Sequence, residues 1–262
     1  MYKIYISTFG KKTIRIKGGV PIEVGAGLRQ NFRYKFRDDS GDNISIENPY
    51  YGELSGMYWV WKNTMIHDDD IIGFCHYNKC LNISKKKCNT WLNQFPQGMI
   101  TINPIKIRNH PYQDEVDAMI ASLSEADRKV YYRLYDVEAA SVGNTCRGGN
   151  MFICRGGQFK SYCQWLFPIL QNARLIIGDK AESSPNMRRY CAYMGERLLS
   201  VYIEANHLPC LNTNVRYKKW WLPMIRAFVN RMHINRNSKP YKMMKKLFGY
   251  RSQYQNKIHS YE

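Results

Sequence analysis

The chain has 262 residues, of which 44% are hydrophobic and 14% aromatic, and its formal net charge is +18. This composition suffices for one sizeable α/β core with a small appendage. The sequence lacks an apolar run of the ~20 residues that a membrane-spanning helix needs, and its start, MYKIYISTFGKK, is typical of a charged strand and not of a signal peptide. We therefore expect a cytoplasmic protein.

Eight cysteines occur in the sequence, without a CxxC pair and without the spacing to histidine that zinc sites use. In a reducing compartment cysteines of this kind are free thiols, and several serve as small core residues. The cysteine pattern therefore argues against a structural zinc site.

Apolar runs and helical spacing predict alternating strands and helices. Strands are expected at residues 3–7, 20–24, 71–75, 99–102 and 150–154, and helices at 51–63, 159–170 and 188–205. Two more helices are expected within 112–136, with Ser124 and Asp127 marking a helix start. Asn48 is a candidate N-cap for the first helix, with Pro49 at the first helical position. The pair Gly156-Gly157 predicts a turn.

This alternation favours a largely parallel sheet with helices on its faces, in which ligands bind at the carboxyl ends of the strands. The sequence also contains a series of polar and aromatic motifs in a fixed order. They are GDNIS at 41–45, Asn48, YxEL at 51–54, YWxWKN at 58–63, Gly73, HY at 76–77, NMFI at 150–153, YCxWLFxIL at 162–170 and GERLL at 195–199. In their order and number they resemble the DUF4422 family of bacterial glycosyltransferases.

The resemblance implies a GT-A-like fold over residues 1–212, with a mostly parallel central sheet flanked by helices. It also implies synthesis of capsule, exopolysaccharide or the O-antigen of lipopolysaccharide from nucleotide sugars. The activity expected on this basis is transfer of a hexose, galactose or galactofuranose being favoured, from a UDP-linked donor to a lipid-linked glycan. The competing class is a noncatalytic module that binds nucleic acid or glycan.

Small and polar residues follow the first two expected strands. Thr8 ends the first strand, and Gly25 and Ala26 follow the second. Small residues let a base or ribose approach the backbone closely, so the resemblance places the donor nucleotide here. It implies acceptors for the ribose hydroxyls at three later positions, Asp39, Asp42 and Asn43. The structural alternative is that Gly25 permits a turn and that Asp42 and Asn43 cap one.

The third strand ends in His76 and Tyr77, where many GT-A enzymes carry two carboxylates that hold Mn²⁺ or Mg²⁺. Here the acidic run at 68–70 precedes the strand, which predicts a solvated turn at the opposite edge of the sheet. His76 and Tyr77 can instead hydrogen-bond the diphosphate or sugar, and Lys79 can supply positive charge. Family members often carry basic residues after this HY pair, and Asn78 departs from that pattern. The structural alternative for His76 is that it only forms a hydrogen bond at the end of the strand. Dependence on a divalent cation stays open.

A carboxylate is the natural base for glycosyl transfer. The resemblance favours Glu196 for this role, beside Arg197 as a phosphate contact, and Glu53 is the second candidate. The structural alternative is an ion pair between Glu196 and Arg188 or Arg189. For the acceptor we expect Trp59 and Asn150, whereas Trp61 and Trp165 fall on apolar helix faces and should be core. The hypothesis requires Asp42, His76 and Glu196 to share one cleft.

Most of the excess charge lies in the C-terminal extension, residues 213–262. From Arg216 onward there are 12 Lys and Arg against one acidic residue, a net charge of +11. Tryptophans and apolar residues alternate there with the cations, which predicts two short amphipathic helices at an anionic membrane surface. The alternatives are packing against the main domain and nonspecific binding of nucleic acid, for which no recognition motif is present.

Overall fold

A computed structural model describes residues 1–106, 113–135, 145–178 and 189–219. The chain divides into two units, Met1–Arg216 and Tyr217–Glu262, and the boundary falls within the strand β10 (Val215–Tyr217). Only residues 217–219 of the second unit are described, so the predicted amphipathic helices lie outside the described residues.

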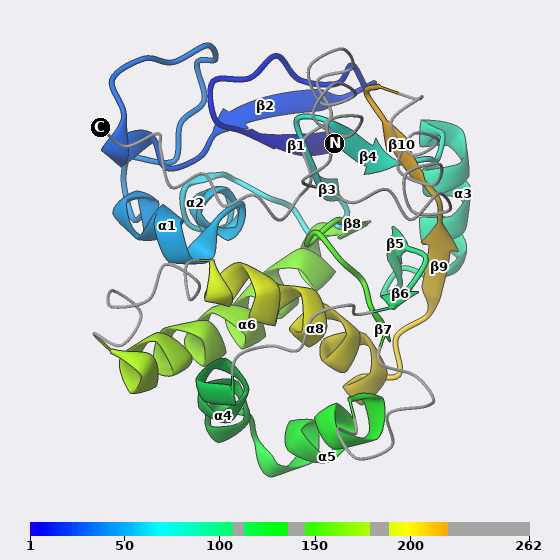
Figure 1. Ribbon diagram of the computed structural model, residues 1–262. Coiled ribbons are helices and arrows are strands. Elements are labelled where there is room, and N and C mark those ends of the chain that lie inside the picture. Colours follow the sequence, from blue (N-terminus) through cyan, green and yellow to red (C-terminus); the bar gives the residue numbers. More distant parts are fainter. Residues whose placement is uncertain (107–112, 136–144, 179–188, 220–262) are drawn as a thin grey trace, which may run out of the picture. The chain divides into compact units, whose positions relative to one another are not determined.

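A mixed sheet forms the centre of this unit (Figure 1). Its other strands are β1 (Tyr2–Thr8), β2 (Gly19–Glu23), β3 (Ile71–His76), β4 (Lys79–Leu81), β5 (Met99–Ile102), β8 (Phe152–Arg155) and β9 (Cys210–Thr213). β1 pairs in parallel with β2 and β3, as β5 does with β9, while β8 runs antiparallel between β3 and β5. Because β1, β2, β3, β5 and β9 share one direction, the expected α/β class with a mostly parallel sheet is confirmed.

The remaining elements surround this sheet. They are η1 (Ala26–Leu28), η2 (Ser45–Glu47), α1 (Asn48–Tyr51), α2 (Leu54–Asn63), α3 (Lys85–Gln94), α4 (Gln113–Ser122), α5 (Glu125–Leu134), α6 (Gly156–Ile177), α8 (Tyr190–Ala205) and a two-stranded sheet of β6 (Ile105–Lys106) and β7 (Thr145–Cys146). Among the described residues, no helix is both long and apolar enough to cross a bilayer.

Two hydrophobic clusters lie on the two faces of the sheet, as strand alternation requires. On β1, Tyr5 belongs to the larger cluster, which α2, α4, α5, α6 and α8 complete. Ile4 and Ile6 belong to the smaller cluster, which α3 covers with Cys88 and Leu92. Figure 1 shows α6 and α8 on one side of the sheet and α3 on the other. Trp61 and Trp165 pack against the larger cluster, as predicted.

The helix expected at 51–63 is two helices. Gly52, at φ +54°, separates α1 from α2, a conformation that an L side chain rarely adopts. Asn48 is itself helical and does not cap α1, so that prediction is wrong. Its side-chain amide donates instead to the carbonyl oxygen of Gly52 at 2.6 Å and to the hydroxyl of Ser55 at 2.8 Å. Asn48 therefore stabilises the break between the helices.

Helix starts show one confirmed and one wrong prediction. Ser124 is the N-cap of α5, and its hydroxyl accepts from the N–H of Asp127 at 3.1 Å. Gly156 and Gly157 do not form a turn but begin α6, because their N–H groups donate to the carbonyl oxygens of Asp70 and Asp68. The acidic run at 68–70 is solvated only in part, since Asp70 is buried.

All eight cysteines are free thiols, and all but Cys210 are buried. The expectation that several of them are small core residues is confirmed, since Cys154 and Cys163 lie in the larger cluster and Cys75, Cys80 and Cys88 in the smaller one.

Candidate active site

A small pocket opens at the carboxyl ends of β1 and β3, the edge at which the sequence predicts ligand binding. Because β1 and β3 are parallel, Ser7 and His76 lie side by side in register. The start of α2 and the turn before β8 complete the wall. The lining residues are Ser7, Glu53, Leu54, Met57, Phe74, Cys75, His76, Gly149 and Asn150.

Gly149 is the residue at which the site converges. The Nε2 atom of His76 lies 2.6 Å from the carbonyl oxygen of Gly149, and the N–H of Gly149 donates to Oε1 of Glu196 at 2.6 Å. A carbonyl oxygen only accepts, so the hydrogen-bond network assigns the imidazole proton to Nε2 and leaves Nδ1 as an acceptor in neutral His76. Gly149 has φ +85°, and a Cβ there would lie 2.7 Å from Nζ of Lys79. The ammonium of Lys79 therefore lies against this turn.

Glu53 forms the second part of the site, where the side chain of Asn150 links it to α8. The Asn150 side-chain amide donates to Oε1 of Glu53 at 2.8 Å and to the carbonyl oxygen of Ala192 at 3.0 Å. Arg189 contacts Oε2 of Glu53 at 2.7 Å. Both partners of the amide nitrogen are acceptors, which fixes the orientation of the Asn150 amide. Its buried Oδ1 has no hydrogen-bond partner among the described residues and faces Gly195 of α8.

The environment shifts the three titratable groups of the site differently. Burial, followed by the charge of Lys79, lowers the pKa of His76 to about 4. Burial alone would raise the pKa of Glu53, but His76, Arg189 and the Asn150 amide outweigh it, so this pKa lies below its usual value. Burial, followed by the Glu53 carboxylate, raises the pKa of Glu196. Two carboxyls whose pKa values are pushed apart can take different roles in acid–base chemistry.

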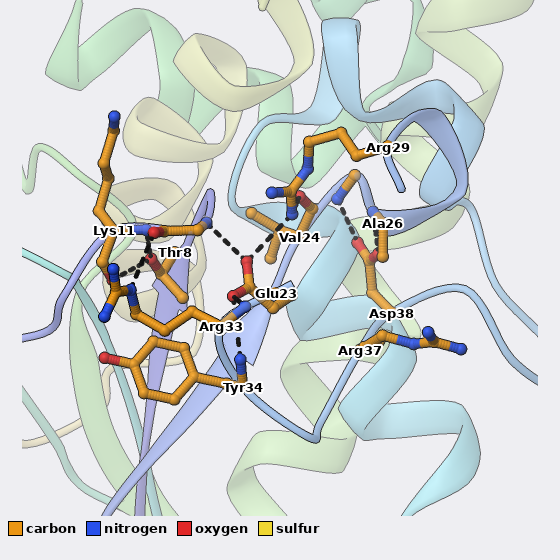
Figure 2. A network of polar contacts seen from close by, with 12 residues as sticks. Thr8, Lys11, Glu23, Val24, Ala26, Arg29, Arg33, Tyr34, Arg37 and Asp38 are labelled. Atoms are coloured by element: carbon orange, nitrogen blue, oxygen red, sulfur yellow. Dashed lines mark hydrogen bonds and ion pairs between the residues drawn. The ribbon is translucent and has the colours of Figure 1, made fainter. Parts of the chain in front are cut away.

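The structure places three predicted donor residues in a network at the ends of β1 and β2 (Figure 2). The hydroxyl of Thr8 donates to the carbonyl oxygen of Lys11 at 2.8 Å and closes a turn. The N–H groups of Gly25 and Ala26 each donate to the carboxylate of Asp38 at 2.9 Å. Gly25 has φ +63°, so the turn itself requires a glycine at this position.

Two buried carboxylates hold this network, and sequence reasoning missed both. Asp38 also accepts from the hydroxyls of Ser45 at 2.5 Å and Ser55 at 2.6 Å. Glu23 accepts from three backbone N–H groups and pairs with Arg29 at 3.1 Å. No local signal marks either residue, because their partners lie on separate segments that only the tertiary fold brings together.

The other acidic donor candidates lie away from the pocket. Asp39 pairs with Arg37 at 3.1 Å. Asp42 accepts from the Tyr58 hydroxyl at 2.9 Å, and its backbone is bonded to the side chain of Asn63, at the opposite end of α2 from Glu53. Of the three residues expected to share one cleft, only His76 lines the pocket, whereas Glu196 is joined to it through a hydrogen bond from Gly149. Asp42 is not part of the lining, so the expectation of one cleft holding all three residues is wrong.

Three further predicted residues also have structural roles. Asn43 closes the turn beside Asp42, with its amide donating to the carbonyl oxygen of Gly41 at 2.9 Å. Trp59 is buried, and its indole N–H donates to the carbonyl oxygen of Ser40 at 2.9 Å. Tyr77 joins β1 to the loop after it through its backbone N–H and carbonyl groups.

The structure gives Arg197 and Arg189 other partners than the sequence suggests. Arg197 is buried, and its guanidinium donates to the carbonyl oxygen of Tyr193 at 3.4 Å, one turn back along α8. Arg189 forms its ion pair with Glu53 and not with Glu196, while Arg188, the other partner considered for Glu196, lies outside the described residues. Arg189 therefore supplies the guanidinium of the site, a role that its position before a helix did not signal.

The carboxylates of the pocket do not form an evident cation site. Glu53 is engaged by Arg189 and Asn150, and Glu196 accepts from Gly149. Among the residues that the structure describes, no three His, Cys, Asp or Glu side chains gather in a way that could hold a metal ion. We therefore derive no chemical step through a metal.

The profile of the family DUF4422, described as a domain of unknown function, matches residues 3–207. A solved structure described as the apo form of the bifunctional glycosyltransferase WbbM has a TM-score of 0.69 to this chain at 22% sequence identity. The match covers 83% of this chain and 45% of that chain, so the chain spans less than half the length of WbbM. At this identity the likeness shows a common fold. No curated protein matches the chain. Because the profile covers well over half of its residues, the chain belongs to the DUF4422 family.

Proposed function

We propose that the chain is a glycosyltransferase that moves a hexose from a UDP-sugar to a lipid-linked glycan in the assembly of bacterial surface polysaccharide. Galactose or galactofuranose is the favoured sugar. The observation that carries the proposal is the convergence of His76, Lys79 and Glu196 on the turn at Gly149, at the edge of the sheet where α/β folds bind ligands. The fold shared with WbbM supports it.

The chemistry of transfer assigns roles to these groups. The bond between the anomeric carbon and the diphosphate breaks, a new bond to the acceptor oxygen forms, and the acceptor hydroxyl loses a proton. Glu196 is the proposed base, because its raised pKa lies closer to neutral pH than that of an ordinary glutamate. Lys79 and Arg189 are the cations of the site that can stabilise charge developing on the departing diphosphate. Neutral His76 can accept a hydrogen bond from a sugar hydroxyl at Nδ1.

A panel of nucleotide sugars tests the proposal. The purified chain is incubated with each donor, with and without a polyprenyl-linked glycan, and release of nucleoside diphosphate is scored. We expect release with a UDP-hexose and faster release when the acceptor is present. The same assay with EDTA tests whether transfer depends on a divalent cation such as Mn²⁺ or Mg²⁺, a question that the sequence leaves open. If no donor gives release of nucleoside diphosphate and no nucleotide gives a thermal shift, the result contradicts the proposed enzyme. It would then favour the noncatalytic binding module.

The place of action follows from the acceptor. A lipid-linked glycan lies in a bilayer, so we propose that the enzyme works at the cytoplasmic face of the membrane, with the basic extension 213–262 as one contact. A variant that ends at Lys219 should bind anionic vesicles less tightly than the full chain does, with a difference that shrinks as salt is added.

A further inference from the structure

We infer that the first unit, Met1–Arg216, itself carries a docking surface for an anionic lipid bilayer, in addition to any contact made by the residues after Arg216. The surface is the basic ridge, defined by eight exposed cations: Lys11, Lys12, Arg15, Lys17, Lys85, Lys86, Lys87 and Arg216. They come from three segments, 10–19, 82–90 and 212–216, none of which contains an acidic residue.

The tertiary fold brings these segments together. The guanidinium of Arg216 donates to the carbonyl oxygen of Arg15 at 3.3 Å. Gly18 packs against Tyr2 so closely that a Cβ would lie 2.7 Å from the ring, and Nζ of Lys85 lies 5.0 Å from the centroid of the same ring. The ridge is therefore one continuous surface and not three separate clusters.

The orientation of the cations is fixed by the core. Ile14 is buried in the smaller hydrophobic cluster and Ile16 packs against it. Arg15 and Lys17, which follow these two residues in turn, are exposed and so point away from the core. Ser84 caps α3, accepting from the N–H of Lys87, and Cys88 and Leu92 anchor that helix, which leaves its three lysines exposed. The cations thus belong to segments that the packed core holds in place.

The form of the ridge indicates its partner. A row of exposed cations on segments that contain no acidic residue matches an extended anionic surface, where each basic side chain contributes to attraction within a Debye length. The choice of a bilayer over other anionic partners rests on the proposed function, which places the acceptor in a membrane. The N–H of Ile14 donates to the carbonyl oxygen of Tyr77 at 2.7 Å, so the ridge begins beside the strand end that carries His76. Docking here would bring the pocket close to lipid-linked acceptors.

Vesicle binding by the full chain tests the inference, with no nucleotide sugar or acceptor present. The probe is a sedimentation assay with vesicles of phosphatidylcholine containing phosphatidylglycerol, beside vesicles of phosphatidylcholine alone. The ridge variant is Arg15→Glu/Lys17→Glu/Lys86→Glu. The control, Lys129→Glu/Arg133→Glu/Lys160→Glu, makes the same charge change at exposed positions of α5 and α6. Thermal unfolding checks that both variants are folded.

We expect the wild type to prefer anionic vesicles, the ridge variant to lose about tenfold or more in partitioning, and the control to stay within about twofold. Equal losses in both variants would show a net-charge effect and overturn the inference, as would unchanged binding by the ridge variant. If the ridge variant keeps its vesicle binding but loses binding to an oligonucleotide, the partner is a nucleic acid and the inference is wrong. Since no turnover is measured, this result is independent of whether the chain proves to be a glycosyltransferase.

Discussion

His76 and Glu196 are linked through a single residue, Gly149. The imidazole of His76 donates to the carbonyl oxygen of Gly149 at 2.6 Å, and the Gly149 N–H donates to the carboxylate of Glu196 at 2.6 Å. The end of β3 and the middle of α8 are thereby coupled through one turn. Any change in this turn should disturb both side chains together.

Gly149→Ala tests this coupling. Gly149 has φ +85°, and a Cβ there would lie 2.7 Å from Nζ of Lys79 and 3.1 Å from Nε2 of His76. We expect a loss of about 2 kcal/mol in the free energy of unfolding, measured in urea, and a fall in donor turnover. The control is Gly157→Ala, where a Cβ would meet Asp68 at an ordinary 3.5 Å. Equal stability of the two variants would show that the turn at Gly149 is not constrained.

Glu196→Gln tests the proposed base. The pKa of Glu196 is raised by burial and by Glu53, and a general base must be ionised. Activity should therefore fall as pH falls through this raised pKa, above the 4.5 of an ordinary glutamate. The variant should lose roughly 10²-fold or more in kcat, together with this acidic limb of the pH–rate profile.

Glu204→Gln is the matched control for this experiment. Glu204 is an exposed glutamate near the end of the same helix, paired with Arg133 on the surface. It should retain wild-type kcat and the acidic limb. An active Glu196→Gln enzyme with an unchanged pH profile would refute the assignment of Glu196 and leave Glu53 as the carboxylate to test.

Asp38→Ala tests the network at the ends of β1 and β2. The carboxylate of Asp38 accepts four hydrogen bonds, and the substitution would leave the buried N–H groups of Gly25 and Ala26 without an acceptor. We expect a loss of about 3 kcal/mol or more in the free energy of unfolding. Asp39→Ala, which removes only a pair with Arg37 near the surface, should change stability by about 0.5 kcal/mol or less.

The same two variants separate a donor role from a structural one. If Asp39 accepts from the donor ribose as the resemblance implies, Asp39→Ala should raise the KM for the donor without lowering stability. An unchanged KM would remove Asp39 from the donor site. Of the two residues, Asp38 is expected to contribute more to the free energy of unfolding, although the sequence does not distinguish it from Asp39.

Local patterns predicted the fold where local interactions determine it. The buried strands β1, β3 and β5 were found as apolar runs, and the start of α5 was found from Ser124. α3 was missed because only Cys88 and Leu92 form its apolar stripe, although its cap at Ser84 was a usable signal. Gly156 was misread because the carbonyl groups that cap α6 come from the loop at 68–70, far away in the sequence.

The candidate site divides in the same way. His76 follows from the position of an apolar run, and Glu196 follows from the resemblance. At the end of the first strand the sequence predicts Thr8, whereas the pocket is lined by its neighbour Ser7. The ion pair of Glu53 with Arg189 and the convergence on Gly149 depend on how α8 packs over the sheet, which no local pattern encodes. Asp42 was misplaced because the sequence does not tell which end of α2 its loop contacts.

The pH dependence of unfolding tests the environment of His76, whose pKa burial and Lys79 lower from 6.5 to about 4. Between these values the unfolded chain binds a proton that the folded chain does not, so stability rises with pH and is lost on acidification. Wild type should lose on the order of 1–3 kcal/mol across this window that His76→Gln does not lose. The raised pKa of Glu196 has the opposite effect in both proteins and so cancels in the difference. Urea unfolding at each pH gives the two curves, and parallel curves would mean that His76 titrates normally in the folded protein.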